Sequence, residues 1–353
     1  MPQQKQNRQL ALRDVAHLAG ASVSTVSRVL AGKNNVASAT ARRVMDAVRK
    51  TGFVVNPARS AAVRARRAPA GLKYGAIAIA SGNPTLSTPD APYPSSEAQH
   101  AIGLLAREMN IAISVCQVTT EELDQRIPPR SLASAPIDGI LMQTLRGRDF
   151  SAVARIAPTV LVGSRPVRQS PLPVVEPDSA LGVETIVDHL YALGHRRLAF
   201  MSHYLDAPDP HMGYLQRRDA FLLRARELGC RAEVCSLDAF DPTPFADAFF
   251  RADPAQRPTA VVVCTDMLAI KLLSAFAERG VSVPGAVSVT GFDGYPVGKH
   301  VFPSLTTWRP DWALLGRTAL RTLLTLIAGD SAPSHTLIGG ALEPGASTAP
   351  PST

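Results

Sequence analysis

From Tyr74 onward, short apolar runs alternate with longer segments in which apolar residues recur every three or four positions. The runs are apolar throughout, as expected for parallel strands buried on both faces. The longer segments are typical of amphipathic helices. This alternation predicts a parallel sheet covered by helices on both faces. The expected strands are residues 75–80, 111–116, 137–143, 159–164, 197–203, 260–265 and 288–292, and the expected helices are residues 96–109, 179–193, 215–228 and 267–279.

The alternation occurs in two successive series, which the proline-rich stretch 166–177 separates. Two series of α/β units predict two lobes with a cleft between them. Ligands of open α/β sheets bind beyond the carboxyl ends of the strands. The cleft is therefore the expected binding site for a small molecule.

Residues 14–30 follow a different pattern, which predicts two short helices joined by a tight turn. Gly20 tolerates the positive φ of a sharp turn, and Val26 points back into the angle between the helices. A third helix is expected over residues 38–51. The outward polar face of the second helix is typical of a helix-turn-helix that reads the major groove of DNA. The small core is expected to include Val15, Ala16, Leu18, Val29 and Leu30.

Charge favours this DNA-binding interpretation over that of an ordinary helical hairpin. Residues 1–67 contain 13 basic and 2 acidic residues, which gives the segment a net charge of +11. The rest of the chain has a net charge of −3, so the overall +8 comes from the first fifth. A basic charge concentrated on the segment with the motif matches the electrostatic footprint expected for DNA phosphates.

Composition argues against several other classes of protein. The four cysteines form no CxxC pair and no metal-ligand spacing with the histidines, so we expect no metal and no cofactor. No run approaches the roughly 18 apolar residues that span a bilayer, and the polar N-terminus lacks a signal core. The sequence contains no phosphate-binding loop and no nucleophile elbow. We therefore expect a cytoplasmic protein that is not an enzyme and does not contact a membrane.

Four blocks of sequence resemble the lactose/galactose-repressor family of bacterial transcription regulators, in the family's order and spacing. They are DVAHLAGASVSTVSRVL (14–30), DHLYALGHRRLAF (188–200), CTDMLAIKLL (264–273) and VPGAVSVTGFDGYP (283–296) with PSLTTW (303–308). The resemblance implies an N-terminal all-α helix-turn-helix domain and an α/β periplasmic-binding-protein-like core of two lobes with parallel sheets. It also implies a homodimer that binds a near-palindromic double-stranded DNA operator under the control of a small-molecule effector.

The resemblance also sets the expected domain boundaries. The helix-turn-helix domain should span residues 1–56, the hinge 57–72 and the core 73–345, with a tail at 346–353. Lobe 1 should comprise about 73–165 and 304–328, and lobe 2 about 175–296 and 333–345. The chain should then cross between the lobes near 165–175, 296–304 and 328–333. Because the tail has no leucine heptad, we expect a dimer without further assembly into a tetramer.

For DNA binding, the resemblance assigns the base-reading positions to Val23, Ser24 and Arg28. Thr25 and Ser27 lie nearby for contacts to bases or phosphates. An arginine can bond guanine with two hydrogen bonds, and a valine methyl can contact the methyl group of thymine. Val23 could instead pack inside, but other apolar residues of this helix already supply the inward stripe.

The hinge departs from the family pattern, which places Ala and then Leu there, the Leu acting as a wedge between base pairs. In this chain the two positions are Arg59 and Ala62, and Val63 is the only sizeable apolar side chain nearby. A wedge needs bulk to offset the cost of unstacking the bases. We therefore expect a weaker kink, in which Arg59 and the arginines after it contact phosphates and the minor groove, with Val63 as the apolar contact.

For the effector site, the resemblance assigns Arg217 as the ligand arginine and Asp293 as the ligand aspartate. Such a pair can bond the hydroxyl or carboxylate groups of a small polar ligand. Thr265 stands where the family usually has Asn, and Asp266 suits a helix N-cap as well as a ligand contact. Phe240 matches an aromatic residue that often stacks on effectors, although a place in the core is equally compatible with it.

Departures from the family leave the identity of the effector open. The strand end that often supplies an acidic ligand residue ends here at Ser164, with no acid. A sugar is therefore only one candidate, beside related metabolites. The sequence thus predicts an effector-controlled transcriptional regulator, and a repressor in particular, because a dimer on its operator blocks polymerase by occupancy. The alternative is a soluble small-molecule-binding protein of periplasmic type, which the basic N-terminal segment argues against.

Overall fold

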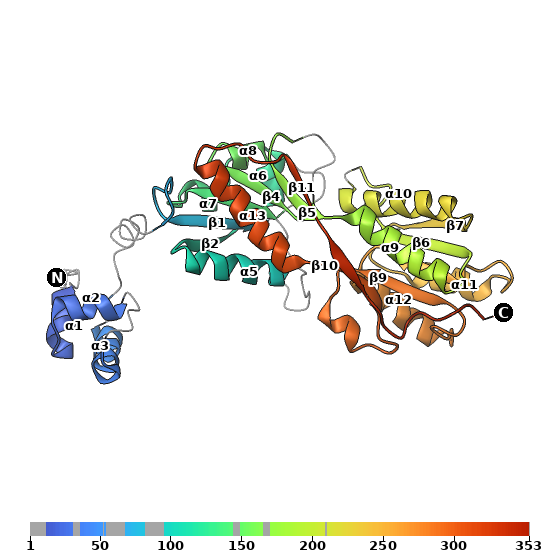
Figure 1. The fold of residues 1–353 in the computed structure, drawn as a ribbon, viewed down its shortest axis with the longest axis horizontal. Coiled ribbons are helices and arrows are strands. Elements are labelled where there is room, and N and C mark those ends of the chain that lie inside the picture. Colours follow the sequence, from blue (N-terminus) through green and yellow to red (C-terminus); the bar gives the residue numbers. More distant parts are fainter. Residues whose placement is uncertain are drawn as a thin grey trace, which may run out of the picture. The chain divides into compact units, whose positions relative to one another are not determined.

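The computed structural model describes residues 12–30, 36–51, 53, 68–81, 95–143, 149–164, 170–208 and 210–352. They belong to two compact units, whose boundary follows residue 63, and each unit has its own hydrophobic core. The first unit holds the helices α1 (Leu12–Ala19), α2 (Val23–Leu30) and α3 (Ser38–Thr51). The second holds two six-stranded sheets with their helices (Figure 1).

Short apolar side chains from three helices form the core of the first unit. Gly20 has a φ of +57°, which allows the tight turn between α1 and α2 that the sequence predicts. The prediction for Leu18 was wrong, because this side chain is 52% exposed. It lies outside the buried stripe that Val15, Ala16 and Ala19 form along α1. The buried core consists of Val15, Ala16, Ala19, Val26, Val44 and Ala47.

The first sheet has the strand order β11-β5-β4-β3-β1-β2, and all of its strand pairs are parallel. Helices α5 (Ser95–Glu108) and α13 (Trp312–Ile327) cover one face, and the short helices α6 (Thr120–Asp124), α7 (Arg130–Ala133) and α8 (Ser151–Ala154) cover the other. The strands are β1 (Ala76–Ser81), β2 (Ala112–Gln117), β3 (Gly139–Gln143), β4 (Thr159–Val162), β5 (Val174–Pro177) and β11 (His335–Ile338).

The second sheet has the order β12-β10-β9-β8-β6-β7, with every pair parallel except β10 with β12. Helices α9 (Ser179–Ala192) and α10 (Met212–Glu227) lie on one face, and α11 (Thr243–Arg251) and α12 (Asp266–Glu278) on the other (Figure 1). A single apolar cluster fills this lobe. The strands are β6 (Arg197–His203), β7 (Arg231–Leu237), β8 (Ala260–Val263), β9 (Ser288–Phe292), β10 (Thr306–Pro310) and β12 (Gly340–Glu343), and the 3-10 turn η2 spans Pro296–Lys299.

The three crossings between the lobes lie further along the chain than the sequence predicts. Strand β5 belongs to the first sheet and β10 to the second, so the crossings follow Pro177, Pro310 and Ile338 instead of falling near 165–175, 296–304 and 328–333. Residues 174–177 thus join lobe 1, and residues 306–310 join lobe 2. These strands have only four or five residues each, and pairing with a neighbouring strand decides such short segments more than their own sequence does.

The C-terminal segment is part of the second lobe, whereas the sequence analysis treated residues 346–353 as a tail. Ser347 is fully buried, and its hydroxyl donates to the carbonyl of Val289 at 2.6 Å. The same oxygen accepts from the backbone N–H of Thr306 at 2.9 Å. His195 binds the carbonyl of Ala349 through Nε2 at 2.9 Å. These contacts fix the segment across β9 and β10, which local sequence alone does not reveal.

Replacing Ser347 with Ala should destabilise the second lobe substantially, although the substitution removes no charge. The change removes two buried hydrogen bonds and leaves the N–H of Thr306 without its partner. Losing a buried partner of this kind costs about 1–3 kcal/mol. Urea unfolding should report this loss, whereas Ser352→Ala, at an exposed position, should change stability by less than about 0.5 kcal/mol. Equal effects of the two substitutions would contradict this role of Ser347.

Two buried histidines should each contribute a loss of stability to the second lobe in mild acid, which the raised pKa values of Asp266 and Asp293 oppose. Burial lowers the pKa of His189 and of His195, whereas the unfolded chain has the ordinary histidine value of about 6.5. Below that pH the unfolded state binds more protons, so the free energy of unfolding falls by at most about 1.4 kcal/mol per pH unit for each histidine. His195→Gln should make the fall between pH 7 and 5 shallower, and the exposed control His100→Gln should not. A slope that His195→Gln leaves unchanged would refute the assignment.

Candidate functional site

Helix α2 begins with a cluster of hydroxyl groups. Ser22 accepts a hydrogen bond from the backbone N–H of Thr25 at 3.1 Å, so it caps the helix. Its Oγ also lies 2.8 Å from the hydroxyl of Ser24 and 2.8 Å from that of Thr25. The sequence analysis missed Ser22, although a serine directly before an apolar helical pattern is a signal for an N-cap.

The predicted base-reading residues share one exposed face of α2. Val23 is 43% exposed, so it does not pack inside, and Ser24, Ser27 and Arg28 are exposed as well. Thr25 is half-buried at the edge of this face. The Nε of Arg28 donates to the carbonyl of Ser24 at 3.3 Å, which holds the arginine along the helix. Arg59 and Val63, the predicted hinge contacts, lie outside the described residues.

In the second lobe, Arg217 of α10 and Asp293, which follows β9, form a buried ion pair. The two residues are 5% and 6% exposed, and Arg217 Nη2 lies 3.4 Å from Asp293 Oδ1. Arg217 also donates to the carbonyl of Cys264 and, at 3.4 Å, to the hydroxyl of Ser179. Its guanidinium stacks on the ring of Phe292, 3.5 Å from the centroid. The sequence analysis named the pair but missed the other three residues, which are scattered along the chain.

The backbone and charge of Asp293 mark it as a strained, buried group. Its φ is +116°, and strain of this kind costs about 1–3 kcal/mol and occurs often at functional sites. Trp312 Nε1 donates to its carbonyl at 2.8 Å, which ties it to the start of α13. Burial raises the pKa of Asp293 to about 6, and the charge of Arg217 opposes this rise. The carboxylate therefore changes charge just below neutral pH.

Asp266 supports the site from inside the lobe. It is fully buried, Oδ2 accepts from the N–H of Tyr295 at 2.6 Å, and Oδ1 accepts from the hydroxyl of Thr307 at 2.6 Å. Burial, and then the charge of Asp293, raise its pKa well above the ordinary value. The N-cap of α12 is Thr265, whereas the sequence analysis considered Asp266 for it. Asp266 thus holds the turn after Asp293 through both of its carboxylate oxygens.

A row of aromatic rings connects Phe240 with Arg217. Phe240 lies edge-on to His203 with centroids 4.9 Å apart, and His203 lies 4.9 Å from Tyr214. The guanidinium carbon of Arg217 is 5.7 Å from the ring of Tyr214. Phe240 is half-buried against the apolar cluster of the lobe, so it is both a core residue and an end of this row. The sequence analysis did not find His203 or Tyr214.

Lobe 1 places three buried polar side chains at the carboxyl ends of neighbouring strands. Ser81 ends β1, Gln143 ends β3, and Ser164 follows β4. Gln143 Oε1 is buried and has no hydrogen-bond partner within the part of the chain that the structure describes. An unpaired buried amide oxygen is costly, so a donor from a ligand would be favourable there. The sequence analysis named Ser164 but not Gln143, although a polar residue closing the apolar run 139–142 was a signal for it.

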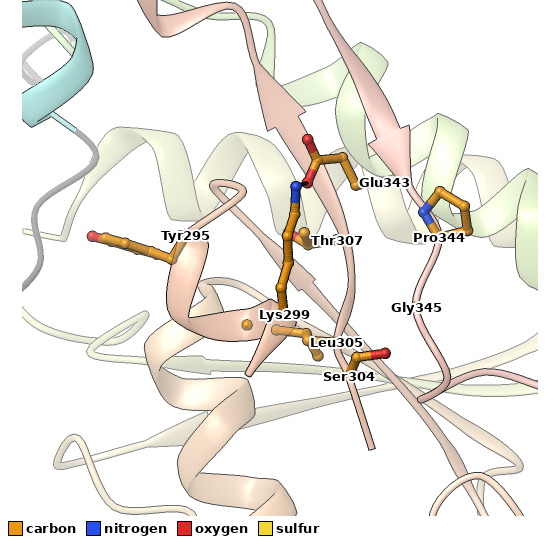
Figure 2. Close-up of a pocket in the computed structure, with 9 residues that line it drawn as sticks. Tyr295, Lys299, Ser304, Leu305, Thr307, Glu343, Pro344 and Gly345 are labelled. Carbon is orange, nitrogen blue, oxygen red and sulfur yellow. Dashed lines mark ion pairs between the residues drawn. The ribbon is translucent and has the colours of Figure 1, made fainter. Parts of the chain in front are cut away.

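A separate open pocket with a volume of about 190 Å³ lies beside the turn that follows Asp293. Figure 2 shows Lys299 reaching along it to an ion pair with Glu343, at 3.0 Å, while the ring of Tyr295 points away. The lining contains none of the predicted effector residues. Because Lys299 is 65% exposed, its ion pair contributes little to stability.

The chemistry of these groups suits reversible binding. Arg217 offers hydrogen-bond donors and Asp293 an acceptor, whereas burial raises the pKa of the Cys264 thiol to about 11 and keeps it protonated. Within the described ranges, no three His, Cys, Asp or Glu side chains are grouped to hold a metal ion. Nor is any helix there long and apolar enough to cross a membrane.

Two family models match this chain. Residues 11–56 match the family described as bacterial regulatory proteins of the lacI family. Residues 187–348 match a periplasmic binding protein-like domain. The first match covers the helices α1 to α3, and the second covers most of the lobe that holds Arg217 and Asp293.

Curated relatives match along nearly the whole chain. The regulator MalR of Streptomyces coelicolor is 30% identical, over 91% of this chain and 91% of its own length. The regulator GntR of Pseudomonas aeruginosa is 30% identical over 90% of this chain and 89% of its length. The lactose operon repressor of Escherichia coli is 25% identical over 98% of this chain and 92% of its length.

Solved structures share the fold. The complex of the regulator CelR with cellobiose aligns with a TM-score of 0.65 at 23% identity, over 96% of this chain and 99% of that one. The lac repressor dimer bound to operator aligns with a TM-score of 0.64 at 22% identity, over 97% and 100%. From the helix-turn-helix, the two-lobed core and these relatives together, we conclude that this chain belongs to the lacI family of bacterial regulatory proteins and is a DNA-binding transcriptional regulator.

Proposed function

We propose that this protein is a transcriptional repressor whose affinity for an operator is set by a small polar effector bound between the lobes of its core. The observation that carries the proposal is the buried Arg217–Asp293 pair at the strand ends of a chain that also exposes a recognition helix. Repression agrees with the lactose operon repressor among the relatives. We infer that it works in the cytoplasm, where its DNA would be, and that it is not an enzyme.

For DNA binding, we propose that Val23, Ser24 and Arg28 contact bases, and that Thr25 and Ser27 contact bases or phosphates. Support comes from the exposure of this face and from the contact that holds Arg28 along the helix. An arginine with free guanidinium donors can bond guanine with two hydrogen bonds. The hinge contacts of Arg59 and Val63 remain part of the proposal.

We propose that two copies of the chain act as a dimer on a near-palindromic operator. Large apolar side chains are exposed where a partner would bury them. Phe302 is 96% exposed, Val115 on the outer strand β2 is 72% exposed, and Leu104 on α5 is 49% exposed. Singly exposed apolar residues are common, but an aromatic ring exposed to this degree is typical of an interface.

For the effector, we propose a sugar or related metabolite that bonds Arg217 and Asp293 from one lobe. Polar groups such as Gln143 and Ser164 would bond it from the other. Among the related proteins, CelR forms a complex with the sugar cellobiose, and another relative is the repressor of the lactose operon. Thr265, Asp266 and Phe240 would shape the wall of the site, because they contact other residues of the protein.

The proposed mechanism is linkage between the two binding sites. An effector that binds one arrangement of the lobes more tightly than the other shifts the population toward it. A change of this kind would alter the spacing of the two hinges in the dimer, and with it the operator affinity. The coupling is reciprocal, so operator DNA must alter effector affinity by the same factor.

Arg28→Ala should reduce operator selectivity more than general DNA affinity. Losing a bidentate pair of hydrogen bonds to guanine costs about 1–3 kcal/mol of discrimination between operator and other sequences, whereas contacts to phosphates would persist. The measurement is binding to an operator selected from genomic fragments by the wild-type protein, compared with an unrelated duplex at the same salt concentration. Arg49→Ala, an exposed arginine of α3, is the matched control and should preserve the ratio. Equal losses on both DNAs for Arg28→Ala would remove it from base recognition.

Asp293→Asn should abolish the response to effector while operator binding persists. We expect a thermal-shift screen of the full chain against sugars, sugar phosphates, nucleosides and small acids to yield a ligand. At 100 times its dissociation constant, that ligand should add about 2.7 kcal/mol of stability. The substitution keeps the shape of the side chain but removes its charge, and asparagine tolerates a positive φ better than alanine does.

The control for this variant is Asp238→Asn, an exposed acid in the same lobe, which should respond like the wild type. Because the pKa of Asp293 is about 6, wild-type affinity for the ligand should also weaken as the pH falls through that value. A full thermal shift in Asp293→Asn would exclude Asp293 from the site.

A further inference from the structure

Glu176 is a buried carboxylate at the point where the chain leaves lobe 1. It lies on β5, and its side chain is 2% exposed. His335 of β11 lies with Nε2 2.7 Å from Glu176 Oε1. Gln216 of α10 donates to the same oxygen across a longer distance of 3.4 Å. One carboxylate oxygen on β5 thus contacts two other segments that are far apart in sequence.

Two of the segments joined at Glu176, β5 and β11, are strands from which the chain crosses between the lobes; we call them the crossing strands. Strands β5 and β11 lie side by side in the first sheet, where Glu176 pairs in register with Leu337. Each strand is followed directly by a crossing into lobe 2, β5 toward α9 and β11 toward β12. A rotation of the lobes must therefore change the backbone near the ends of both strands.

The third segment carries the proposed effector contact. Gln216 directly precedes Arg217, and Arg217 Nε lies 3.4 Å from the hydroxyl of Ser179, two residues beyond the end of β5. Helix α10 thus contacts the first crossing at two points, Gln216 with Glu176 and Arg217 with Ser179. A ligand that moves Arg217 would therefore first change the distances in these two contacts.

We propose that Glu176 is a positioning residue that couples α10 to both crossing strands, so that a shift of Arg217 moves β5 and β11 together. The buried carboxylate favours this role, because leaving it without donors in the lobe interior is costly and its contacts resist separation. The functional consequence rests on the proposed function, whereas the mechanical coupling does not.

Hydrogen exchange of the full chain, followed by mass spectrometry without any ligand, tests the coupling. The three segments to follow are residues 174–177, 335–338 and 212–219. Glu176→Ala should raise exchange at least about ten-fold in all three together. Glu176→Gln keeps an acceptor oxygen at the same place and should stay within about three-fold of the wild type.

Variants that remove one contact of Glu176 at a time separate the contribution of His335 from that of Gln216. His335→Ala should raise exchange in 335–338 but not in 212–219, and Gln216→Ala should do the reverse. The matched control is Arg224→Ala, which breaks the contact of α10 with Asp188 on α9, at 2.7 Å, and should act only near that contact.

Three results would overturn the proposal. One is an effect of Glu176→Ala confined to β5, and another is a Glu176→Gln variant that behaves like Glu176→Ala. The third is a three-segment response in Arg224→Ala, which would mean that α10 loosens as a whole. Because no effector enters this experiment, a failed ligand screen would count against the proposed function and leave the coupling untouched.

Discussion

The buried ion pair between Arg217 and Asp293 is the interaction on which the strand ends of the second lobe depend. Two charges can remain in such an interior only if each is paired and hydrogen-bonded. Arg217 therefore also bonds Cys264 and Ser179, while Asp293 is held at a φ of +116° by its neighbours. Asp266 in turn is buried to hold the turn after Asp293. The same requirement explains why so many polar side chains are buried at this end of the sheet.

This arrangement links the proposed effector contacts to the connections between the lobes. Ser179, which Arg217 contacts, follows the first crossing, and Trp312, which bonds the carbonyl of Asp293, follows the second. Glu176 and His335 lie on the two strands that end at the first and third crossings. Each crossing thus has a polar contact at or near the proposed effector site. A small displacement of Arg217 or Asp293 would therefore change contacts at all three connections between the lobes.

Much of the fold could be predicted from the sequence, because long periodic segments carry a strong signal. The strands 197–203 and 288–292 and the helix 38–51 match the predicted bounds. The strands β5, β10 and β11 were assigned to the wrong side of a crossing or missed, since pairing with strands distant in sequence decides which sheet such short strands join. The C-terminal segment was taken for a tail because its anchor, Ser347, is bonded by residues 58 and 41 positions away.

The sequence by itself determined the class of protein and the helix-turn-helix, and it named the two principal residues of the proposed effector site. The helix-turn-helix follows from local spacing and from the basic charge of the first fifth. The two site residues follow from the resemblance to the lactose/galactose-repressor family, at motifs such as GFDG. Only the tertiary structure decided which residues join them, because Phe292, Trp312 and Glu176 have no local signature. Their roles come from burial beside a partner on another element, where an unpaired polar group would be costly. That condition exists only once the sheets and their crossings have formed.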